Sequence, residues 1–341
     1  GKAPYDKELW KGLAEMGFMG TAIPEEYGGL GASYLELCVI AEEMGRAVAP
    51  VPFASSIFLA AEFLLGAGTE AQKHAYLPKL ASGEAIGCFA LAEGVGAATP
   101  KRIQTKVAGG KITGTKLPVL DGDVADFAIV AAKTGTGNDA RSISLFIVDL
   151  KGAGVTCETV ETIDPTRSQA KITFSGADAE LLGAEGEGWS IIERVLDRAA
   201  VLTAFEQLGG ADRALEMARD YALDRMAFGR PIGSFQAVKH MLADMYVSAT
   251  LARSNCYYGA WALSTGAAEL PEAAATARVS ATQAYQHCAK NNIQVHGGMG
   301  FTWQFDCHLY YRRSNLLALS LGSLSTWEDK LIERLRAKNA A

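Results

Sequence analysis

The sequence lacks an excess of basic residues. Lysine and arginine number 32 against 38 aspartate and glutamate residues, which gives a formal net charge of −6. Proteins that bind nucleic acid through its phosphates usually carry a basic surface. The composition therefore argues against a nucleic-acid partner, and the acidic balance by itself identifies no other one.

The sequence also lacks the cysteine patterns of metal sites and disulfide frameworks. Its six cysteines lie far apart, without a C-x-x-C pair and without histidines at the spacing of metal ligands. We therefore expect no metal and no disulfides, but reduced thiols in the core of a cytoplasmic protein. These cysteines are Cys38, Cys88, Cys157, Cys256, Cys288 and Cys307.

No apolar run is long enough to cross a membrane. The most apolar stretch, residues 53–65, is short and is interrupted by Ser55, Ser56 and Glu62. No basic segment followed by an apolar one opens the chain, so we expect neither a signal peptide nor a membrane span. Because the chain begins with glycine in the middle of a helical pattern, we expect that some N-terminal residues are missing.

What the sequence contains is three segments of different periodicity. Its 341 residues, 49% of them apolar, are enough for two or three domains. Helical spacing at the start predicts an N-terminal helical domain, residues 1–82. Short β-rich runs, such as 127–130 and 143–148, predict a β-barrel or β-sandwich in the middle, residues 83–188. Long helical stretches then predict a C-terminal four-helix bundle, residues 189–341, so the fold class is α+β multidomain.

Helix starts and breaks are marked along the chain. Three segments fit a capping box, and a proline suits the first turn of a bundle helix. Two glycine-rich segments interrupt the bundle helices. The capping boxes are residues 33–36, 69–72 and 325–328, the proline is Pro271, and the breaks are 229–233 and 297–300.

Several stretches, in order over nearly the whole chain, together resemble the acyl-CoA dehydrogenase family. They are residues 16–20, 23–29, 221–232, 235–236, 242–245 and 294–301. The resemblance implies the same order of helices, strands and helices, with a β-barrel as the middle domain. It also implies FAD-dependent α,β-dehydrogenation of acyl-CoA thioesters. In the family, the strand domain of one subunit holds the flavin ring, and the bundle of the neighbouring subunit reaches the adenine and pyrophosphate end.

The resemblance implies a set of cofactor-binding residues in the bundle. A pyrophosphate needs a fixed cation and close backbone donors. By resemblance Arg225 would be that cation, and Phe228 and Gln236 would line the adenine. The side facing the diphosphate or ribitol would consist of Gln294, Gly297 and Gly298.

Each of these residues also has a simpler interpretation. Arg225 could be a solvated surface arginine, and the glycine pair at 297–298 could be a plain helix C-cap. Gln236 could cap its own helix after Ser234. Two nearby histidines are expected to be ordinary, partly buried residues without a chemical role: His240 and His296.

The half-site for the flavin ring departs from the family pattern. The family run T-E-P-x-A-G-S-D corresponds here to residues 92–99, in which Ala92 and Ala98 stand at the two hydroxyl positions. The run W-I-T-N-G corresponds to residues 118–122, with Pro118 and Leu120 in place of tryptophan and threonine. Each lost contact costs roughly 1 kcal/mol or more, so we expect this chain's own strand domain to hold a flavin ring poorly.

The catalytic base of the family is also missing. Its reaction needs a carboxylate beside the α-carbon of the thioester. One lineage supplies it from an E-G-T run, which corresponds to residues 321–323 and places Leu321 at the base position. Another supplies it from the first bundle helix, at Ala199. We therefore assign no catalytic residue, and we expect the nearby carboxylates to be solvated helix charges: Glu193, Asp197, Glu206 and Glu328.

These features suggest a subunit that is active only with a different, base-bearing partner. Residues 300–304 and 308–313 resemble a subgroup of heterotetramers that act on bulky acyl-CoA such as sterol side chains. The resemblance implies an acyl-CoA substrate, a second acyl-CoA dehydrogenase-like subunit in an α2β2 assembly, and an electron-transfer acceptor. Two alternatives remain open. One is an autonomous homo-oligomeric dehydrogenase with a substitute base, and the other is a flavin-free structural or regulatory relative.

Overall fold

The computed structural model describes residues 4–339, which fall into two compact units. The first unit contains the residues up to Ser33 together with Pro50–Ala199, and the second contains Tyr34–Ala49 together with the residues from Ala200 onward. One N-terminal helix is therefore grouped with the C-terminal helices. The three-domain division expected from the sequence remains a prediction.

The first unit begins with helices. They are α1 (Lys7–Glu15), η1 (Phe18–Gly20), η2 (Glu25–Tyr27), η3 (Ala54–Ala61), α3 (Glu62–Ala67) and α4 (Glu70–Ala81). The apolar stretch forms η3 and α3, and its polar residues are paired inside the unit. Ser55 donates to the Asp121 carboxylate at 2.7 Å, and Glu62 lies 2.5 Å from Arg198. Within residues 4–339 no helix has the length and apolarity needed to cross a membrane, and the cytoplasmic location stays a prediction.

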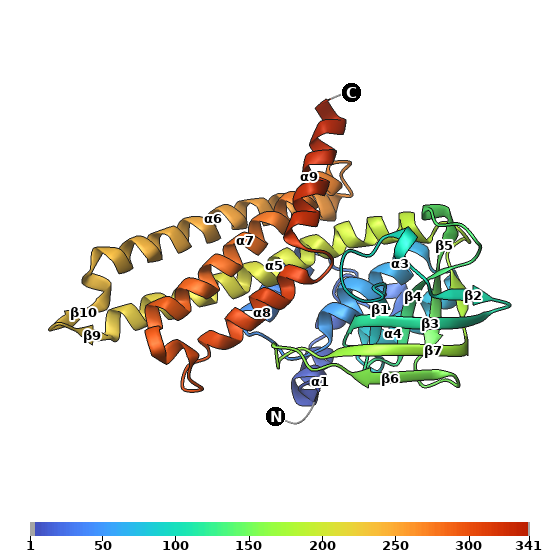
Figure 1. Ribbon diagram of the computed structural model, residues 1–341, viewed down its shortest axis with the longest axis horizontal. Coiled ribbons are helices and arrows are strands. Elements are labelled where there is room, and N and C mark those ends of the chain that lie inside the picture. The colour runs from blue at the N-terminus through green and yellow to red at the C-terminus, as the bar shows by residue number, and fades with distance from the viewer. Residues whose placement is uncertain (1–3, 340–341) are drawn as a thin grey trace. The chain divides into compact units, whose positions relative to one another are not determined.

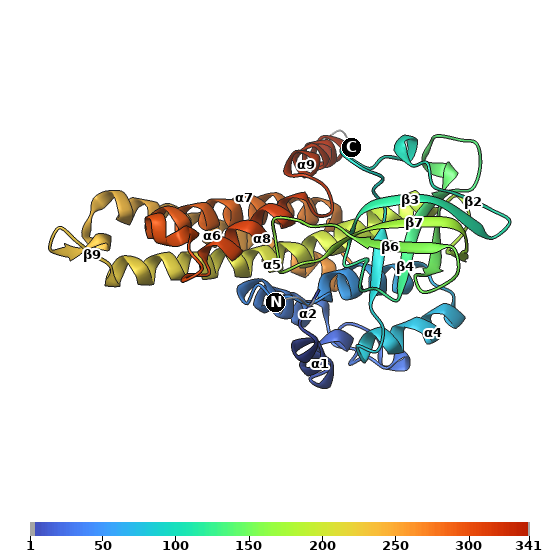
Figure 2. The same cartoon turned by 60° about the horizontal axis from the view of Figure 1, so that its bottom comes forward.

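The strands of the first unit form one eight-stranded sheet, which confirms the β middle (Figures 1 and 2). The strand order is β6-β7-β3-β2-β4-β5-β8, and β1 pairs with β4 in parallel. Two apolar runs seen in the sequence became β4 and β5, which are almost wholly buried. The strands are β1 (Gly87–Ala90), β2 (Lys106–Ala108), β3 (Lys111–Leu120), β4 (Phe127–Lys133), β5 (Ile143–Asp149), β6 (Val155–Thr159), β7 (Gln169–Asp178) and β8 (Glu180–Leu182). Short 3-10 turns precede β2 and β5: η4 (Pro100–Arg102) and η5 (Ala140–Ser142).

The second unit consists of long helices lying side by side (Figures 1 and 2). Both predicted breaks are confirmed, because a small hairpin and η6 separate α5 from α6, and η7 ends α7. The elements are α2 (Tyr34–Arg46), α5 (Gly188–Asp224, whose first turns belong to the first unit), β9 (Met226–Ala227), β10 (Arg230–Pro231), η6 (Ile232–Ser234), α6 (Gln236–Thr265), α7 (Leu270–His296), η7 (Gly297–Phe301), α8 (Cys307–Leu319) and α9 (Leu324–Asn339).

The backbones of α2 and α5 touch, which is possible only because glycines lie at the crossing. A Cβ atom added to Gly45 would lie 1.7 Å from the carbonyl oxygen of Glu206. One added to Gly209 would lie 1.8 Å from the carbonyl oxygen of Glu42. Real Cβ contacts are never this short, so no larger residue fits at either position without separating the helices.

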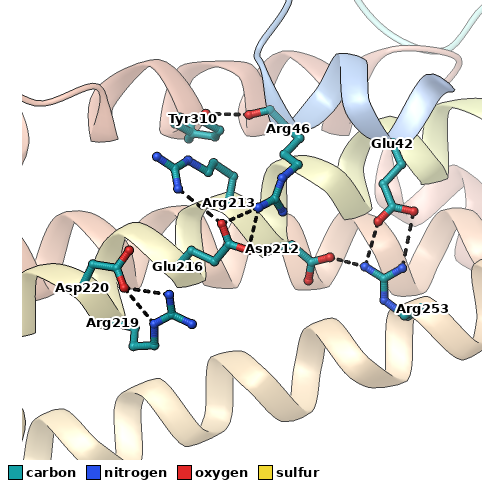
Figure 3. Close-up of polar contacts among 9 residues, drawn as sticks. All are labelled: Glu42, Arg46, Asp212, Arg213, Glu216, Arg219, Asp220, Arg253 and Tyr310. Atoms are coloured by element: carbon teal, nitrogen blue, oxygen red, sulfur yellow. Dashed lines mark hydrogen bonds and ion pairs between the residues drawn. The ribbon is translucent and has the colours of Figure 1, made fainter. Parts of the chain in front are cut away.

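Ion pairs flank this crossing (Figure 3). Arg253 of α6 reaches both Glu42 of α2, at 2.8 Å, and Asp212 of α5. Arg46 of α2 binds Glu216 of α5 at 2.5 Å. These contacts fix the register of α2 along α5 and explain why the second unit includes a helix from the N-terminal part of the chain.

Two arginines without access to water bind consecutive residues of α5. Arg313 of α8 lies 3.0 Å from the carboxylate of Glu206, and both side chains are at most 1% exposed. Arg278 of α7 donates to the side-chain oxygen of Gln207. The expectation that Glu206 and Asp197 are solvated is wrong, since both are buried, whereas the other two carboxylates of that set are exposed as expected.

The predicted helix starts have mixed outcomes. The capping box of α4 is confirmed, with Thr69 and Gln72 bonding each other's backbone at 3.0 and 3.2 Å. Pro271 lies in the first turn of α7, as expected. The third box is wrong, because α9 begins earlier and the Ser323 hydroxyl accepts from the backbone of Thr326 at 3.3 Å.

All six cysteines are free thiols, and five of them are buried. Cys157 is exposed on the edge strand β6, so the expectation of a core position is wrong for this one. Most residues of this strand are exposed, and the apolar periodicity of the sequence did not reveal that the strand lies at the edge of the sheet.

Removing the carboxylate of Glu206 should destabilise the chain strongly. Glu206→Gln removes the carboxylate charge that lies 3.0 Å from the buried Arg313 guanidinium, and breaking a buried ion pair costs about 3–5 kcal/mol. Chemical unfolding followed by circular dichroism measures this loss. The double variant Glu206→Gln/Arg313→Met should recover much of it, while Glu328→Gln, at an exposed position, should change stability by less than about 0.5 kcal/mol. A small effect for Glu206→Gln would contradict the buried pair.

Candidate functional site

Four chain segments meet at one end of the second unit. They are the end of α5, the β9–β10 hairpin, the start of α6 and the end of α7 (Figure 1). The backbone of Ile232 donates to the Arg225 carbonyl at 2.8 Å, which ties η6 to the end of α5. His296 of α7 stacks on Tyr221 of α5, with ring centroids 4.1 Å apart and planes at 24°. All six residues implied by the family resemblance lie on these segments.

All six implied residues are exposed in this chain. Arg225 follows α5 directly, and no carboxylate in the part that the structure describes forms an ion pair with its guanidinium. Gln236 begins α6, a helix of 30 residues whose N-terminal end carries the positive end of its dipole. An unpaired guanidinium and a helix N-terminus on adjoining segments suit a phosphate group. The donor set therefore fits the pyrophosphate of FAD.

The hairpin holds Phe228 in a conformation that favours glycine. Phe228 and Gly229 form its two-residue loop, with φ of 53° and 77°. A hairpin turn with positive φ at both positions usually contains asparagine or glycine, so a phenylalanine is strained there. The residue is 95% exposed, its ring meets Phe235 edge to face at 6.2 Å, and Arg230 lies over the same Phe235 ring. An aromatic ring held outward at the cost of strain suggests a binding surface.

The glycine pair lies where α7 ends. Gly297 caps the helix with φ 58° and ψ −138°, a conformation that residues with a side chain rarely adopt, and its N–H donates to the carbonyl of Gln294. Gly297 is therefore a helix C-cap, as the simpler interpretation of the glycine pair predicted. A Cβ atom added to Gly297 or Gly298 would meet nothing within 4 Å, so the backbone here is open to close approach by a ligand or another chain.

His296 has a structural role in this arrangement. It is buried between Tyr221 and Phe305, and its Nδ1 donates to the Asn292 carbonyl at 2.9 Å. Burial lowers its pKa from the ordinary value, so the ring stays neutral and can stack. His240 is exposed, so the expectation that it is partly buried is wrong. Nothing in the sequence pattern signalled that these aromatic rings join the ends of α5 and α7.

The two segments that the resemblance assigns to the flavin ring lie side by side in the first unit. Their side chains lack the polar groups of the family pattern. Leu117 donates to the carbonyl of Ala92 at 2.8 Å and accepts from Gly94 at 2.7 Å, so the alanine lies beside Pro118 at the end of β3. The Arg102 guanidinium folds into the following loop and donates to two of its carbonyls. The cavity left in this loop is about 30 Å³, room for a single water molecule. The alanines at the two hydroxyl positions, Ala92 and Ala98, offer no hydrogen-bonding side chain to a flavin ring.

A buried ion pair lies under the same loop. Lys116 has no exposed side-chain surface and lies 2.8 Å from Glu93, whose carboxylate also accepts from the backbone of Gln104 and Thr105. Burial lowers the pKa of Lys116 to about 8, although Glu93 opposes that effect. The pair anchors the loop to β3 and offers no group to a ligand.

Neither base position can abstract a proton. Leu321 lies in the loop between α8 and α9 with φ 62°, and its carbonyl accepts from Trp327 at 3.1 Å. Arg278 holds the same loop through the carbonyl of Ser320 at 2.6 Å. The alternative position, Ala199, is fully buried. The loop at Leu321 is therefore held by hydrogen bonds at both ends, but the side chain at the base position is apolar.

Comparison with known proteins agrees with this geometry. Residues 2–84 match the family described as Acyl-CoA dehydrogenase, N-terminal domain, and residues 186–334 match Acyl-CoA dehydrogenase, C-terminal domain. The acyl-CoA dehydrogenase IpdE2 of Mycobacterium tuberculosis is 34% identical over 316 residues, 91% of this chain and 81% of the relative. The mitochondrial isovaleryl-CoA dehydrogenase of Solanum tuberosum is 31% identical over 331 residues, 94% and 80% of the two chains.

Solved structures share the fold over almost the whole chain. A Tcur3481-Tcur3483 steroid ACAD has a TM-score of 0.88 at 30% identity, covering 99% of this chain and 90% of that one. The ChsE4-ChsE5 complex from Mycobacterium tuberculosis contains a chain with a TM-score of 0.88 at 28% identity, with 98% and 89% covered.

The buried lysine should give the chain a pH-dependent stability. Between about pH 8 and 10.5 the folded chain has released the Lys116 proton while the unfolded chain still holds it, so the free energy of unfolding rises with pH, by up to about 3 kcal/mol. Urea unfolding at several pH values should therefore show wild type gaining stability relative to Glu93→Gln/Lys116→Met. A difference between the two proteins that stays constant over this range would contradict the assignment.

Proposed function

The chain belongs to the acyl-CoA dehydrogenase family, FAD-dependent oxidoreductases that act on acyl-CoA, and we propose that it works as the base-lacking subunit of a heteromer. In this proposal it closes the adenine and pyrophosphate end of an FAD whose ring is held by a different, catalytic subunit. The observation that carries the proposal is the exposed, unpaired Arg225 beside the N-terminal end of α6, in a chain without a carboxylate at either base position.

The family residues that this chain keeps and those that it lacks belong to different flavins. In the family, the ring contacts and the base act at one flavin within a subunit, whereas the adenine contacts act at the flavin of its neighbour. Here the ring contacts and the base are replaced, by Ala92, Ala98, Pro118, Leu120 and Leu321. The residues implied for the adenine contacts are present and exposed. This division supports pairing with a different chain, since a second copy of this chain would also lack the ring contacts.

The bundle residues then have distinct tasks at the partner's flavin. Arg225 and the first N–H groups of α6 would hold the pyrophosphate, and Phe228 with Gln236 would line the adenine. Gln294 and the open backbone at 297–298 would face the diphosphate or ribitol. FAD, when bound, supplies the acceptor for the β-hydride of the acyl-CoA. The proton from the α-carbon would pass to a carboxylate of the partner, because this chain has none at either base position.

Two solved relatives support a bulky substrate and assembly with a second subunit, and we propose the α2β2 form. One solved relative is described as a steroid ACAD and another as a ChsE4-ChsE5 complex. We extend both features to this chain as proposals: a steroid-derived or similarly bulky acyl-CoA, a second dehydrogenase-like subunit, and an electron-transfer acceptor for the reduced flavin. The alternatives are an autonomous homo-oligomeric dehydrogenase with a substitute base and a flavin-free relative with a structural or regulatory role.

The chain alone should be colourless and inactive. Without the ring contacts it should purify with little flavin, and without a base it should not reduce an electron acceptor in the presence of acyl-CoA. Co-expression with a partner that carries the carboxylate should give the flavin absorption spectrum and turnover. Leu321→Glu in the isolated chain should stay inactive, because the ring contacts remain absent. Turnover by the chain alone would show that it is an autonomous enzyme, and a colourless, inactive complex would favour the flavin-free alternative.

Replacing Arg225 should loosen the flavin in the assembled complex. Arg225→Ala removes a charge-assisted contact worth about 1.5–3 kcal/mol, which corresponds to roughly 10- to 150-fold weaker flavin binding. Flavin content per complex, measured from the absorption spectrum after dialysis, reports the loss. The matched control is Arg219→Ala, another exposed arginine of the same helix end, which pairs with Asp220 and should have no effect. Equal flavin content in both variants would remove Arg225 from the site.

A further inference from the structure

The loop that corresponds to the family's flavin-ring run, residues 94–98, is folded around an arginine of this chain. Arg102 is the last residue of η4, and its guanidinium turns back to the loop. Its Nη2 donates to the carbonyl of Val95 at 2.5 Å, and its Nη1 donates to the carbonyl of Ala97 at 3.3 Å. Two backbone carbonyls of the loop therefore point at one cation.

The guanidinium lies directly against the main chain of the loop. A Cβ atom added to Gly96 would lie 2.4 Å from Nη1 of Arg102, and Gly96 has φ 95°. Both the close approach and the backbone conformation require glycine at this position. The cavity that remains beside the arginine is about 30 Å³, which is far too small for the fused rings of a flavin.

Hydrogen bonds to the chain after η4 hold the arginine at the loop. The Glu93 carboxylate accepts from the backbone of Gln104 at 2.6 Å and from that of Thr105 at 3.0 Å. Glu93 precedes the loop and the two donors follow Arg102, so the carboxylate draws the two ends of residues 93–105 together. The chain itself thus presents the arginine to the loop before any ligand binds.

This contact also changes what the loop offers to a ligand. By the family resemblance, hydroxyl groups at the positions of Ala92 and Ala98 would bond the flavin ring and a phosphate. Here the carbonyls of the loop are directed to a guanidinium, and a carbonyl oxygen only accepts hydrogen bonds. Phosphate oxygens need donors. A loop that binds a cation through its carbonyls is therefore poorly suited to a flavin phosphate.

We propose that Arg102 occupies the flavin-ring half-site of this chain and excludes the cofactor from it. The inference rests on the proposed function and adds that the half-site is closed as well as deprived of contacts. In the heteromer this closure leaves the partner's strand domain as the place for the flavin ring. Loss of the hydroxyl groups alone would have a different consequence, because restoring them would then restore binding.

Binding of FMN to the full chain, expressed without a partner, tests the proposal. FMN has the ring and one phosphate but no adenine, so quenching of its fluorescence reports the ring half-site alone. Ala92→Thr/Ala98→Ser should bind FMN no better than wild type, because Arg102 still fills the loop. Adding Arg102→Ala should tighten binding at least about tenfold, the equivalent of one hydrogen bond to a charged group.

The matched control adds Lys101→Ala, at the neighbouring exposed cation, to the same double variant and should leave FMN binding unchanged. Tight binding by the double variant would show that only the hydroxyl groups were missing. Binding that does not improve when Arg102 is removed, or that becomes weaker, would show that the arginine does not exclude the flavin. Each of these results would overturn the proposal.

Hydrogen exchange provides a second measurement that needs no restored hydroxyl groups. In Arg102→Ala the amides of residues 94–98 should exchange faster, because the loop has lost the cation that holds it. Guanidinium chloride, far below the concentration that unfolds the chain, should slow this exchange again, whereas sodium chloride at the same ionic strength should not. Exchange that the substitution leaves unchanged, or that guanidinium does not slow, would also overturn the proposal. The heteromer is tested separately, by the spectrum of the co-expressed complex, so the two proposals can fail independently.

Discussion

The second unit depends on two arginines that have no contact with water. Arg313 and Arg278 come from different helices, and they bind Glu206 and Gln207, which are neighbours on α5. A buried cation without a partner is strongly unfavourable, so α7 and α8 can pack against α5 only in the register that pairs both. Arg278 also binds carbonyls at the end of α8 and thereby holds the loop at Leu321. The position of the family's base is thus fixed by the same contacts that fix the bundle.

The arrangement of the proposed adenine half-site follows from this packing. With α5 and α7 held in register, Tyr221 and His296 stack at their shared end, and the exposed residues on either side of them come together. No single motif specifies that end, because each segment supplies one or two groups and none of them binds phosphate alone. The ring half-site shows the opposite case. Its backbone pairing is intact, yet apolar side chains at Ala92, Pro118 and Leu120 leave it without polar groups.

The incorrect expectations have a common cause. Glu206 and Asp197 were expected to be solvated because charged residues are seldom buried, yet the structure buries both of these carboxylates. The partner of Glu206 lies 107 residues further along the chain. Cys157 was expected to be buried but is exposed, since an edge strand exposes residues that a central strand would bury. In each case burial was decided by neighbours from distant parts of the sequence.

The sequence by itself determined what depends on residues within a few turns of each other. Apolar spacing predicted the helices, the β middle and the long bundle helices, and the glycines at 229 and 297 marked the breaks. The family motifs and the missing carboxylates were also visible there. Only the tertiary structure decided which polar groups are buried and that α2 belongs with the C-terminal helices. Pairing energies and exposure depend on contacts between distant segments, and a local pattern does not record those contacts.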